Sequence, residues 1–323
     1  MSLYRKISKA WKRLRYYGGN FARYFLPSGW WRIMYQRKIK RLTPDELARM
    51  EKRVKYYINL PEGASYNPKT AVEVGNFHFP YKAKKKFSGY FFDLFELVRC
   101  GNRNNKFNYL FGDIREETDC ACFVKSRPVS AGTSLSVITR LDGLRHFAFI
   151  SDTRDYKSKK DMLVFRNVVQ HQPWRTAFLR LYHNHPMVDA GQVNHDMAEN
   201  PAHIKPRLSI EEQLEYKFIC CIEGHDVATN LKWVMSSNSI AVMPRPRIES
   251  WYMEGTLKGD YHYIEVKPDY SDVIDKIQYY IDHPEEAEAI ISHAHEYVNQ
   301  FRDTRRELLI GRMVAMRYFQ LTN

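Results

Sequence analysis

The sequence predicts an α/β protein in which helices join the strands of a parallel sheet. Two observations carry this prediction. Apolar segments of strand length alternate with helical segments through the second half of the chain, which is typical of βαβ units. The chain has 323 residues, a length that suits two domains of ordinary size. Hydrophobic residues make up 44% and charged residues 27%, as in ordinary globular proteins.

The first half contains fewer regular segments. Residues 44–58 are expected to form a helix, because Thr43 suits the N-cap position and Pro44 the first helical position. Residues 59–88 are irregular, and their lysine-rich run at 82–86 is expected to be a solvated loop. Three apolar segments follow, a buried segment at 90–98 and strands at 107–112 and 146–150.

The second half alternates strand and helix more clearly. Ser209 and Glu212 form a capping box at the start of a helix. The expected strands are 163–165, 218–222, 240–243 and 261–266. The expected helices are 176–182, 211–217, 227–236, 271–281, 284–301 and 304–319. Because ligands of parallel sheets bind outside the carboxyl ends of the strands, the loops after these strands are the candidate site.

The basic charge is concentrated at the N-terminus. Residues 1–44 hold twelve Lys or Arg residues and no Asp or Glu. The remaining 38 basic residues nearly balance the 37 acidic residues, so the leader accounts for most of the net charge of +13. Aromatic residues are interleaved with these cations. This composition predicts that residues 1–41 dock on an anionic membrane surface.

An amphipathic pattern supports that interpretation. Leu3, Ile7, Trp11 and Leu14 recur at helical spacing and give one apolar face. A basic helix packed onto its own domain is the main alternative. Nucleic-acid binding is disfavoured, because no nucleic-acid module accompanies the leader and the rest of the chain carries no excess charge.

The sequence also bears on the compartment. It contains no apolar run long enough to span a membrane, and its N-terminus lacks the apolar core of a secretory signal. The five cysteines form no C-x-x-C pair, which is typical of reduced thiols. We therefore expect a cytoplasmic protein, peripheral on the inner face of the cytoplasmic membrane.

Three stretches carry candidate site residues. Residues 223–233 follow an apolar strand, and a helix N-terminus there, with Lys232, would suit a phosphate. Arg166 and Arg175 follow another strand, where arginines can neutralise a pyrophosphate. The acids of the loop at 244–255 could bind a ribose. Taken singly, an ordinary turn, surface salt bridges and a structural loop explain these stretches equally well.

Five ordered motifs are more specific together than singly. They are Phe-Arg at 165–166 with His-Gln-Pro-Trp-Arg at 171–175, Asp-Ala-Gly-Gln-Val-Asn at 189–194, Leu-Ser-Ile-Glu-Glu-Gln at 208–213, Ile-Glu-Gly-His-Asp-Val-Ala-Thr-Asn-Leu-Lys-Trp at 222–233 and Glu-Ser-Trp-Tyr-Met-Glu-Gly at 249–255. This set resembles glycosyltransferase family 90, over roughly residues 70–300. It looks most like the bacterial lipopolysaccharide branch of that family.

The resemblance implies a GT-B fold, with two Rossmann-like domains facing across a cleft. It also implies inverting, metal-independent transfer from a UDP-sugar, with UDP-glucose favoured, and no permanently bound cofactor. By motif, Arg175 and Lys232 would contact the diphosphate, and Glu249 and Glu254 would lie at or near the ribose. The backbone N–H groups at the diphosphate would come from Val227, Ala228, Thr229 and Asn230.

The resemblance also implies a catalytic aspartate that ends a strand of the N-terminal domain. Asp113 fits best, and Asp119 is the reserve candidate. Inversion requires one carboxylate to take a proton from the acceptor hydroxyl, together with positive charge on the departing diphosphate. The chain has no D-x-D triplet, and its histidines have irregular spacing, so no metal site is expected.

These interpretations give a domain plan and a function. The plan is a basic leader at 1–44, an acceptor-side domain at 45–155, a nucleotide-sugar domain at 156–300 and a terminal helix at 301–323. The function is transfer of a hexose from a UDP-sugar to a lipopolysaccharide core or related saccharide. The alternatives are a capsule or protein O-glycosyltransferase of the same family, and a non-catalytic module that binds saccharide or membrane.

Overall fold

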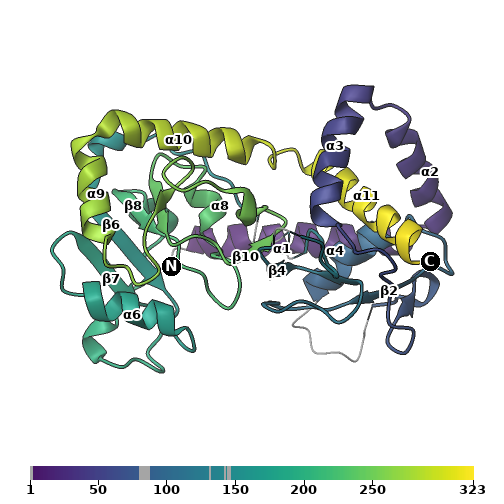
Figure 1. Ribbon diagram of the computed structural model, residues 1–323, viewed down its shortest axis with the longest axis horizontal. Coiled ribbons are helices and arrows are strands. Elements are labelled where there is room, and N and C mark those ends of the chain that lie inside the picture. The colour runs from purple at the N-terminus through teal and green to yellow at the C-terminus, as the bar shows by residue number, and fades with distance from the viewer. Residues whose placement is uncertain (1–2, 80–87, 131, 142, 144–146) are drawn as a thin grey trace. The chain divides into compact units, whose positions relative to one another are not determined.

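The structure is a computed structural model that describes residues 3–79, 88–130, 132–141, 143 and 147–323, with only the backbone of residues 3–9 and 12. The expected loop at 82–86 and residue 146 lie outside the described residues. The chain forms two compact units (Figure 1). Unit 1 contains Met1–His146 and Asp303–Asn323, and unit 2 contains Phe147–Arg302. The leader and the terminal helix therefore both belong to unit 1.

Unit 1 begins with three helices, α1 (Leu3–Tyr24), α2 (Ser28–Ile39) and α3 (Pro44–Tyr57). The start predicted for α3 is confirmed. The Thr43 hydroxyl accepts a hydrogen bond from the Glu46 N–H, and the Glu46 carboxylate accepts one from the Thr43 N–H. This reciprocal capping box satisfies two N–H groups that a helix end otherwise leaves unpaired.

The sheet of unit 1 has the order β1-β2-β3-β5. Its strands are β1 (Val72–Glu73), β2 (Lys106–Tyr109), β3 (Cys122–Val124) and β5 (Ser136–Ile138), and the short β4 spans Ser126–Pro128. The pairs β2–β3 and β3–β5 are parallel, while β1 pairs with β2 antiparallel. Parallel strands end at one edge of a sheet, so the loops after β2 and β3 meet there.

The prediction of a strand at 146–150 is wrong for residues 147–150, the part that the structure describes. Residues 147–150 form no strand and are only half-buried. The Ile150 N–H donates to the Ser236 hydroxyl instead of to a neighbouring strand, and the Arg302 guanidinium lies over the Phe149 ring. The apolar pattern here therefore reflects packing of a connecting segment.

The terminal helix α11 (Thr304–Thr322) packs against α3 and against α4 (Ser88–Val98), as Figure 1 shows for the yellow helix. A methyl group on Gly311 would lie 2.9 Å from a Leu97 methyl carbon, so α11 and α4 approach closely at this glycine. The Glu307 carboxylate is buried and accepts a hydrogen bond of 2.8 Å from Arg53 of α3. These contacts make the terminal helix part of the unit 1 core.

Unit 2 contains a five-stranded sheet with the order β11-β9-β8-β6-β7. The strands are β6 (Lys160–Asn167), β7 (Val188–Gln192), β8 (Tyr216–Cys220), β9 (Ile240–Met243) and β11 (Ile264–Glu265), and all neighbours are parallel. The chain runs outward from β6 to β7 and then crosses to the other side of β6. The strand order therefore reverses between β6 and β8, and ligands of such sheets bind at that point, outside the carboxyl ends.

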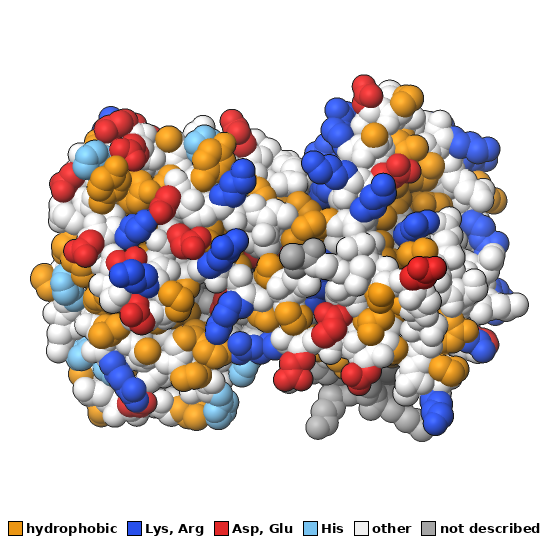
Figure 2. All heavy atoms as spheres, viewed as in Figure 1, with side chains coloured by type: hydrophobic (Ala, Val, Ile, Leu, Met, Phe, Trp, Pro, Cys, Tyr) orange, Lys and Arg blue, Asp and Glu red, His pale blue; other side chains and the backbone are white. Residues whose placement is uncertain are grey.

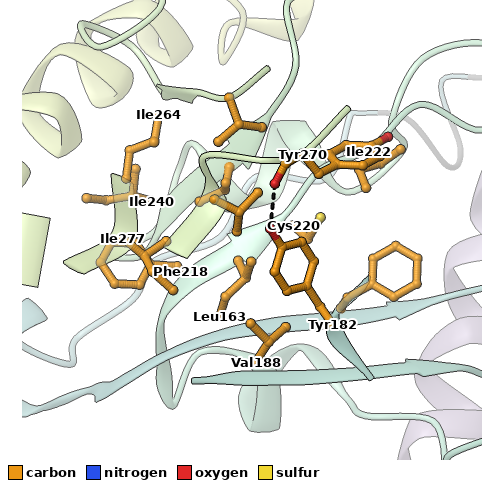
Figure 3. Packing of buried hydrophobic residues seen from close by; sticks show 14 of the residues in the cluster. Leu163, Tyr182, Val188, Phe218, Cys220, Ile222, Ile240, Ile264, Tyr270 and Ile277 are labelled. Atoms are coloured by element: carbon orange, nitrogen blue, oxygen red, sulfur yellow. Dashed lines mark hydrogen bonds between the residues drawn. The ribbon is translucent and has the colours of Figure 1, made fainter. Parts of the chain in front are cut away.

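The core of unit 2 lies where helices cover this sheet. Leu163, Phe218 and Ile240 come from three adjacent strands and pack near Ile277 of α9 (Figure 3). The Tyr182 hydroxyl donates to the carbonyl of Tyr270, the contact drawn in Figure 3. The long helices are α6 (Pro173–Tyr182), α9 (Val273–Asp282) and α10 (Pro284–Asn299). The α/β class predicted from strand–helix alternation is confirmed.

Two predicted helices of unit 2 are much shorter than expected. The capping box of Ser209 and Glu212 is present, but α7 spans only Ile210–Gln213, because β8 begins at Tyr216. The helix expected at 227–236 is the single turn α8 (Leu231–Val234). The expected strand at 261–266 is reduced to β11. The remaining short elements are η1 (Val74–Asn76), η3 (Tyr156–Ser158), η4 (Pro201–His203), β10 (Ile248–Ser250) and η5 (Glu254–Thr256).

Among the described residues, no helix combines the length and the apolar character that crossing a bilayer requires.

Candidate active site

A pocket of about 740 Å³ opens at the carboxyl edge of the unit 2 sheet. Ligand pockets of proteins usually measure roughly 300–1,000 Å³. The walls come from the loops after β8, β9 and β11, and Trp174 of α6 extends them toward the point where the strand order reverses. All lining residues belong to unit 2. The pocket therefore lies where the sheet topology places a ligand.

The acidic side chains that line the pocket are already engaged. The Glu223 carboxylate accepts bonds from the N–H groups of Arg247 and Ile248 and pairs with the Arg247 guanidinium at 3.2 Å. Lys276 pairs with Asp260, and the Tyr263 hydroxyl donates to Glu265 at 2.7 Å. In the same wall, Asp272 accepts from the Lys267 N–H and Glu254 pairs with Lys232.

Two cations of the pocket have no such match. Arg245 follows β9 and Lys267 follows β11, and both side chains are exposed. Neither has an ion-pair partner among the residues that the structure describes. Arg247, by contrast, lies over the Trp174 ring and pairs with Glu223. Unmatched cations beside satisfied carboxylates favour an anionic ligand in this pocket.

Arg175 organises the edge of the sheet on which the pocket opens. Its Nε donates to the Glu223 carbonyl at 2.9 Å, its Nη1 to Val168 at 2.8 Å and its Nη2 to Ile222 at 2.9 Å. These three carbonyls belong to the loop after β6 and to the segment after β8. Burial lowers the pKa of Arg175 to about 10. The guanidinium therefore stays charged at neutral pH and holds the two segments together.

Lys232 and Glu254 form a buried ion pair with an Nζ–Oε1 distance of 2.8 Å. Their side chains are only 1% and 2% exposed. Ser250 donates to the same carboxylate through its N–H at 2.6 Å and through its hydroxyl at 2.8 Å. Glu254 lines the pocket, so Lys232 is linked to the pocket through this carboxylate. Glu249 is buried on β10, next to Ser250.

The segment expected to supply backbone N–H groups forms part of the pocket wall. Val227 and Ala228 line the pocket, whereas Thr229 is exposed. The Asn230 side chain donates to the Cys220 carbonyl at 3.0 Å and ties the segment back to β8. Because α8 is a single turn, it supplies little of the dipole of a longer helix.

Arg166 is engaged at the opposite side of the sheet. Its Nη2 donates to both carboxylate oxygens of Asp189 on β7, at 2.7 and 2.8 Å. Lys205 and Tyr216 donate to the same carboxylate. Burial alone would raise the pKa of Asp189, but these hydrogen bonds lower it to about 2. The group links β6, β7 and β8, which is a structural role for Arg166.

Asp113 lies at the carboxyl edge of the unit 1 sheet. It follows Gly112, whose φ of 122° is a conformation that side chains disfavour. The Asp113 Oδ1 accepts a bond of 2.6 Å from Lys125, which follows β3 and whose side chain is only 3% exposed. The Asp113 side chain itself is 37% exposed. Asp119 lies exposed in the same loop. A half-exposed carboxylate fixed by a buried ammonium can still meet an external hydroxyl group.

The structure thus brings several predicted residues to one pocket and adds others. Val227, Ala228 and Glu254 line the pocket, and Lys232 and Arg175 support it from behind. Sequence reasoning missed Arg245 and Lys267. The signal for both was their position directly after a strand, and the loop after β9 was singled out only for its acids.

Comparisons with known proteins identify the family and a full-length relative. The model of the family described as glycosyl transferase family 90 matches residues 143–305, which include all of unit 2. O-glucosyltransferase LpsA of Dichelobacter nodosus is 36% identical to the chain over 322 residues, which are 99% of each protein. Uncharacterized protein 179R of Invertebrate iridescent virus 6 is 32% identical over 124 residues, 36% of this chain and 10% of its own. The full-length match covers both units.

Proposed function

Because the chain belongs to glycosyl transferase family 90, we propose that it transfers glucose from UDP-glucose to a hydroxyl group of a lipopolysaccharide core or a related saccharide. The glucosyl group is favoured because the full-length relative is named an O-glucosyltransferase. The observation that carries the proposal is the unit 2 pocket, in which Arg245 and Lys267 are the unmatched charges. A nucleotide diphosphate has the size and charge for such a site.

The donor is held on unit 2 in this proposal. Its diphosphate lies against the wall formed by Val227 and Ala228, where Arg245 and Lys267 can reach it. Arg175 carries its charge just behind this wall and adds to the positive potential, while the mutually neutralised pair of Lys232 and Glu254 fixes the shape of the wall. Cationic side chains then stabilise the departing UDP, and the transfer does not depend on a metal ion.

The acceptor is activated on unit 1. Asp113 takes the proton of the acceptor hydroxyl as the hydroxyl oxygen attacks the anomeric carbon. The bond between that carbon and the phosphate oxygen breaks, and UDP leaves with the electron pair. Attack from the face opposite to UDP inverts the anomeric configuration. This chemistry suits the GT-B fold that we propose for the chain.

The location of the acceptor in a membrane accounts for the basic residues at the N-terminus. Lipopolysaccharide precursors are held in a membrane, so the enzyme works as a peripheral protein on the cytoplasmic face of the inner membrane. The twelve cations of the leader suit that surface.

A transfer assay tests the proposal. Purified protein is incubated with UDP-[14C]glucose and truncated lipopolysaccharide, and radiolabelled saccharide is measured. We expect transfer by the wild type, loss of about 10³-fold or more in kcat with Asp113→Asn, and nearly unchanged affinity for UDP. The matched variant Asp119→Asn should keep its rate. Near-normal turnover by Asp113→Asn would show that another group is the base, and UDP binding without transfer to any saccharide would favour a non-catalytic module.

A further inference from the structure

Helix α1 presents one apolar stripe to solvent. Trp11, Leu14 and Phe21 of α1 and Phe25, directly after its end, are separated by three, seven and four residues, spacings that place them on one side of the helix. All four side chains are exposed, Trp11 and Phe25 by 66% each. The Phe21 and Phe25 rings lie edge to face, 5.1 Å apart. A continuous stripe of this kind is unusual on a helix that only covers its own domain.

The opposite face of α1 is anchored to α4. The Tyr16 hydroxyl donates to the Gly89 carbonyl and to the Asp93 carboxylate. Arg23 pairs with Glu96 at 3.3 Å, and the Tyr24 ring packs 4.9 Å from the Phe95 ring. The helix is therefore held in one orientation, and the exposure of its stripe is a fixed property of unit 1.

Helix α2 also has one exposed face and one face packed against unit 1. Trp30, Ile33 and Arg37 are exposed and recur at helical spacing. Trp31 on the other face is 5% exposed, with the guanidiniums of Arg99 and Arg312 at 4.5 and 5.0 Å from its ring. The exposed face continues into cations at the C-terminal end of the helix and beyond, at Arg37, Lys40 and Arg41.

The exposed apolar residues are concentrated here rather than scattered. Fourteen large hydrophobic side chains are exposed among the described residues, and seven of them lie between positions 11 and 33. The same leader has twelve Lys or Arg residues and no acid. Figure 2 shows Lys and Arg side chains gathered over α2 and α3. Apolar side chains in a segment with this excess of cations match the chemistry of an anionic lipid surface.

We infer that the exposed faces of α1 and α2 form a lipid-docking surface, which inserts Trp11, Phe21, Phe25 and Trp30 at headgroup depth while neighbouring Lys and Arg residues contact lipid phosphates. The inference deepens the peripheral location in the proposed function and is independent of the pocket and of Asp113. A nucleic acid would use the cations but not the apolar stripe. A second copy of the chain would bring the same twelve cations together.

The test compares full-length variants, because deletion of residues 1–40 would also remove the contacts with α4. Co-sedimentation is measured with phosphatidylglycerol–phosphatidylcholine vesicles and with pure phosphatidylcholine vesicles. We expect the wild type to bind the anionic vesicles and to lose binding in high salt. The variant Trp11→Ser/Phe21→Ser/Phe25→Ser should bind at least about tenfold more weakly, since burial of a single large apolar side chain changes a partition constant by that factor.

The matched control replaces three exposed hydrophobic residues elsewhere, Leu181→Ser/Met197→Ser/Leu321→Ser, and should bind as the wild type does. Both triple variants should keep the thermal unfolding midpoint and the affinity for UDP, which separates failure of this inference from failure of the proposed function. Equal binding of both triple variants would overturn the inference. Failure of the wild-type protein to bind anionic vesicles would also overturn it. So would a dimer in light scattering that forms through the α1 stripe.

Discussion

The ammonium of Lys232 and the carboxylate of Glu254 lie 2.8 Å apart and are almost completely buried, so each neutralises the other next to the pocket. Removal of one partner leaves an uncompensated buried charge, which costs about 3–5 kcal/mol. We expect this loss for Lys232→Met in the free energy of unfolding, measured with urea. The double variant Lys232→Met/Glu254→Gln should recover part of it.

The exposed pair Lys160–Glu215 has the same N–O distance of 2.8 Å and serves as the control. Both of its side chains are about half exposed, and Lys160→Met should cost less than about 1 kcal/mol. Equal costs for Lys232→Met and Lys160→Met would contradict the structural role assigned to the buried pair.

The unmatched cations of the pocket predict how phosphates contribute to binding. Arg245→Gln and Lys267→Gln should each weaken UDP binding by about tenfold, because each removes a charge-assisted contact, and should leave uridine binding nearly unchanged. Calorimetric titration of both ligands measures the difference. Arg207→Gln removes an exposed cation outside the pocket and should affect neither ligand. A parallel loss for UDP and uridine would place these side chains at the nucleoside instead.

The backbone at Gly112 predicts a selective defect on the acceptor side. Gly112→Ala places a side chain at φ 122°, which costs about 1–3 kcal/mol of backbone strain. Relaxation of this strain moves the neighbouring Asp113. We expect kcat to fall by at least about tenfold with unchanged donor affinity. Gly63→Ala introduces comparable strain at φ 74° in another loop of unit 1 and should lower stability without a change in kcat. Equal kcat values for the two variants would refute the link to Asp113.

The Asp189 group predicts a dependence of stability on pH. Its pKa is about 2 in the folded protein and about 3.8 when free, so ionised Asp189 stabilises the fold above about pH 4. This contribution is lost as the pH falls toward 2. Asp189→Asn should therefore unfold more easily by about 1–2 kcal/mol at pH 7, after allowance for partial solvent screening, and the difference should vanish near pH 2.

Glu51→Gln alters an exposed carboxylate on α3 and should show no such pH dependence. Asp189→Asn should also leave UDP affinity unchanged, because Arg166 and Asp189 stabilise the far side of the sheet. A large loss of UDP affinity would show that Arg166 acts at the donor site, as its position after the expected strand 163–165 predicts.

Local patterns were the best guide to the fold. Thr43 caps its helix as predicted, Ser209 and Glu212 form the predicted capping box, and β9 spans the residues expected. Element lengths were less predictable. The helix expected at 227–236 contracts to Leu231–Val234, because the preceding residues pack as pocket wall rather than as helix. Such a choice depends on tertiary contacts that periodicity does not contain.

Site prediction met a similar limit. The structure has a pocket at the strand ends to which the sequence pointed, but a sequence does not reveal which cations are already paired. Arg166 is occupied by Asp189 and Lys232 by Glu254, whereas Arg245 and Lys267 have no carboxylate partner among the described residues. The partners of the first two lie more than twenty positions away in the chain, as the numbering of each pair shows. Only the folded sheet brings them together.

Hydrogen–deuterium exchange with UDP-glucose tests the central claim most directly, that unit 2 holds the donor in the pocket at the carboxyl edge of its sheet. The account predicts slower exchange in the loops at 221–231, 243–248 and 264–268, with little change in β7. Protection confined to unit 1 or to the Arg166–Asp189 side, with these three loops unchanged, would contradict it.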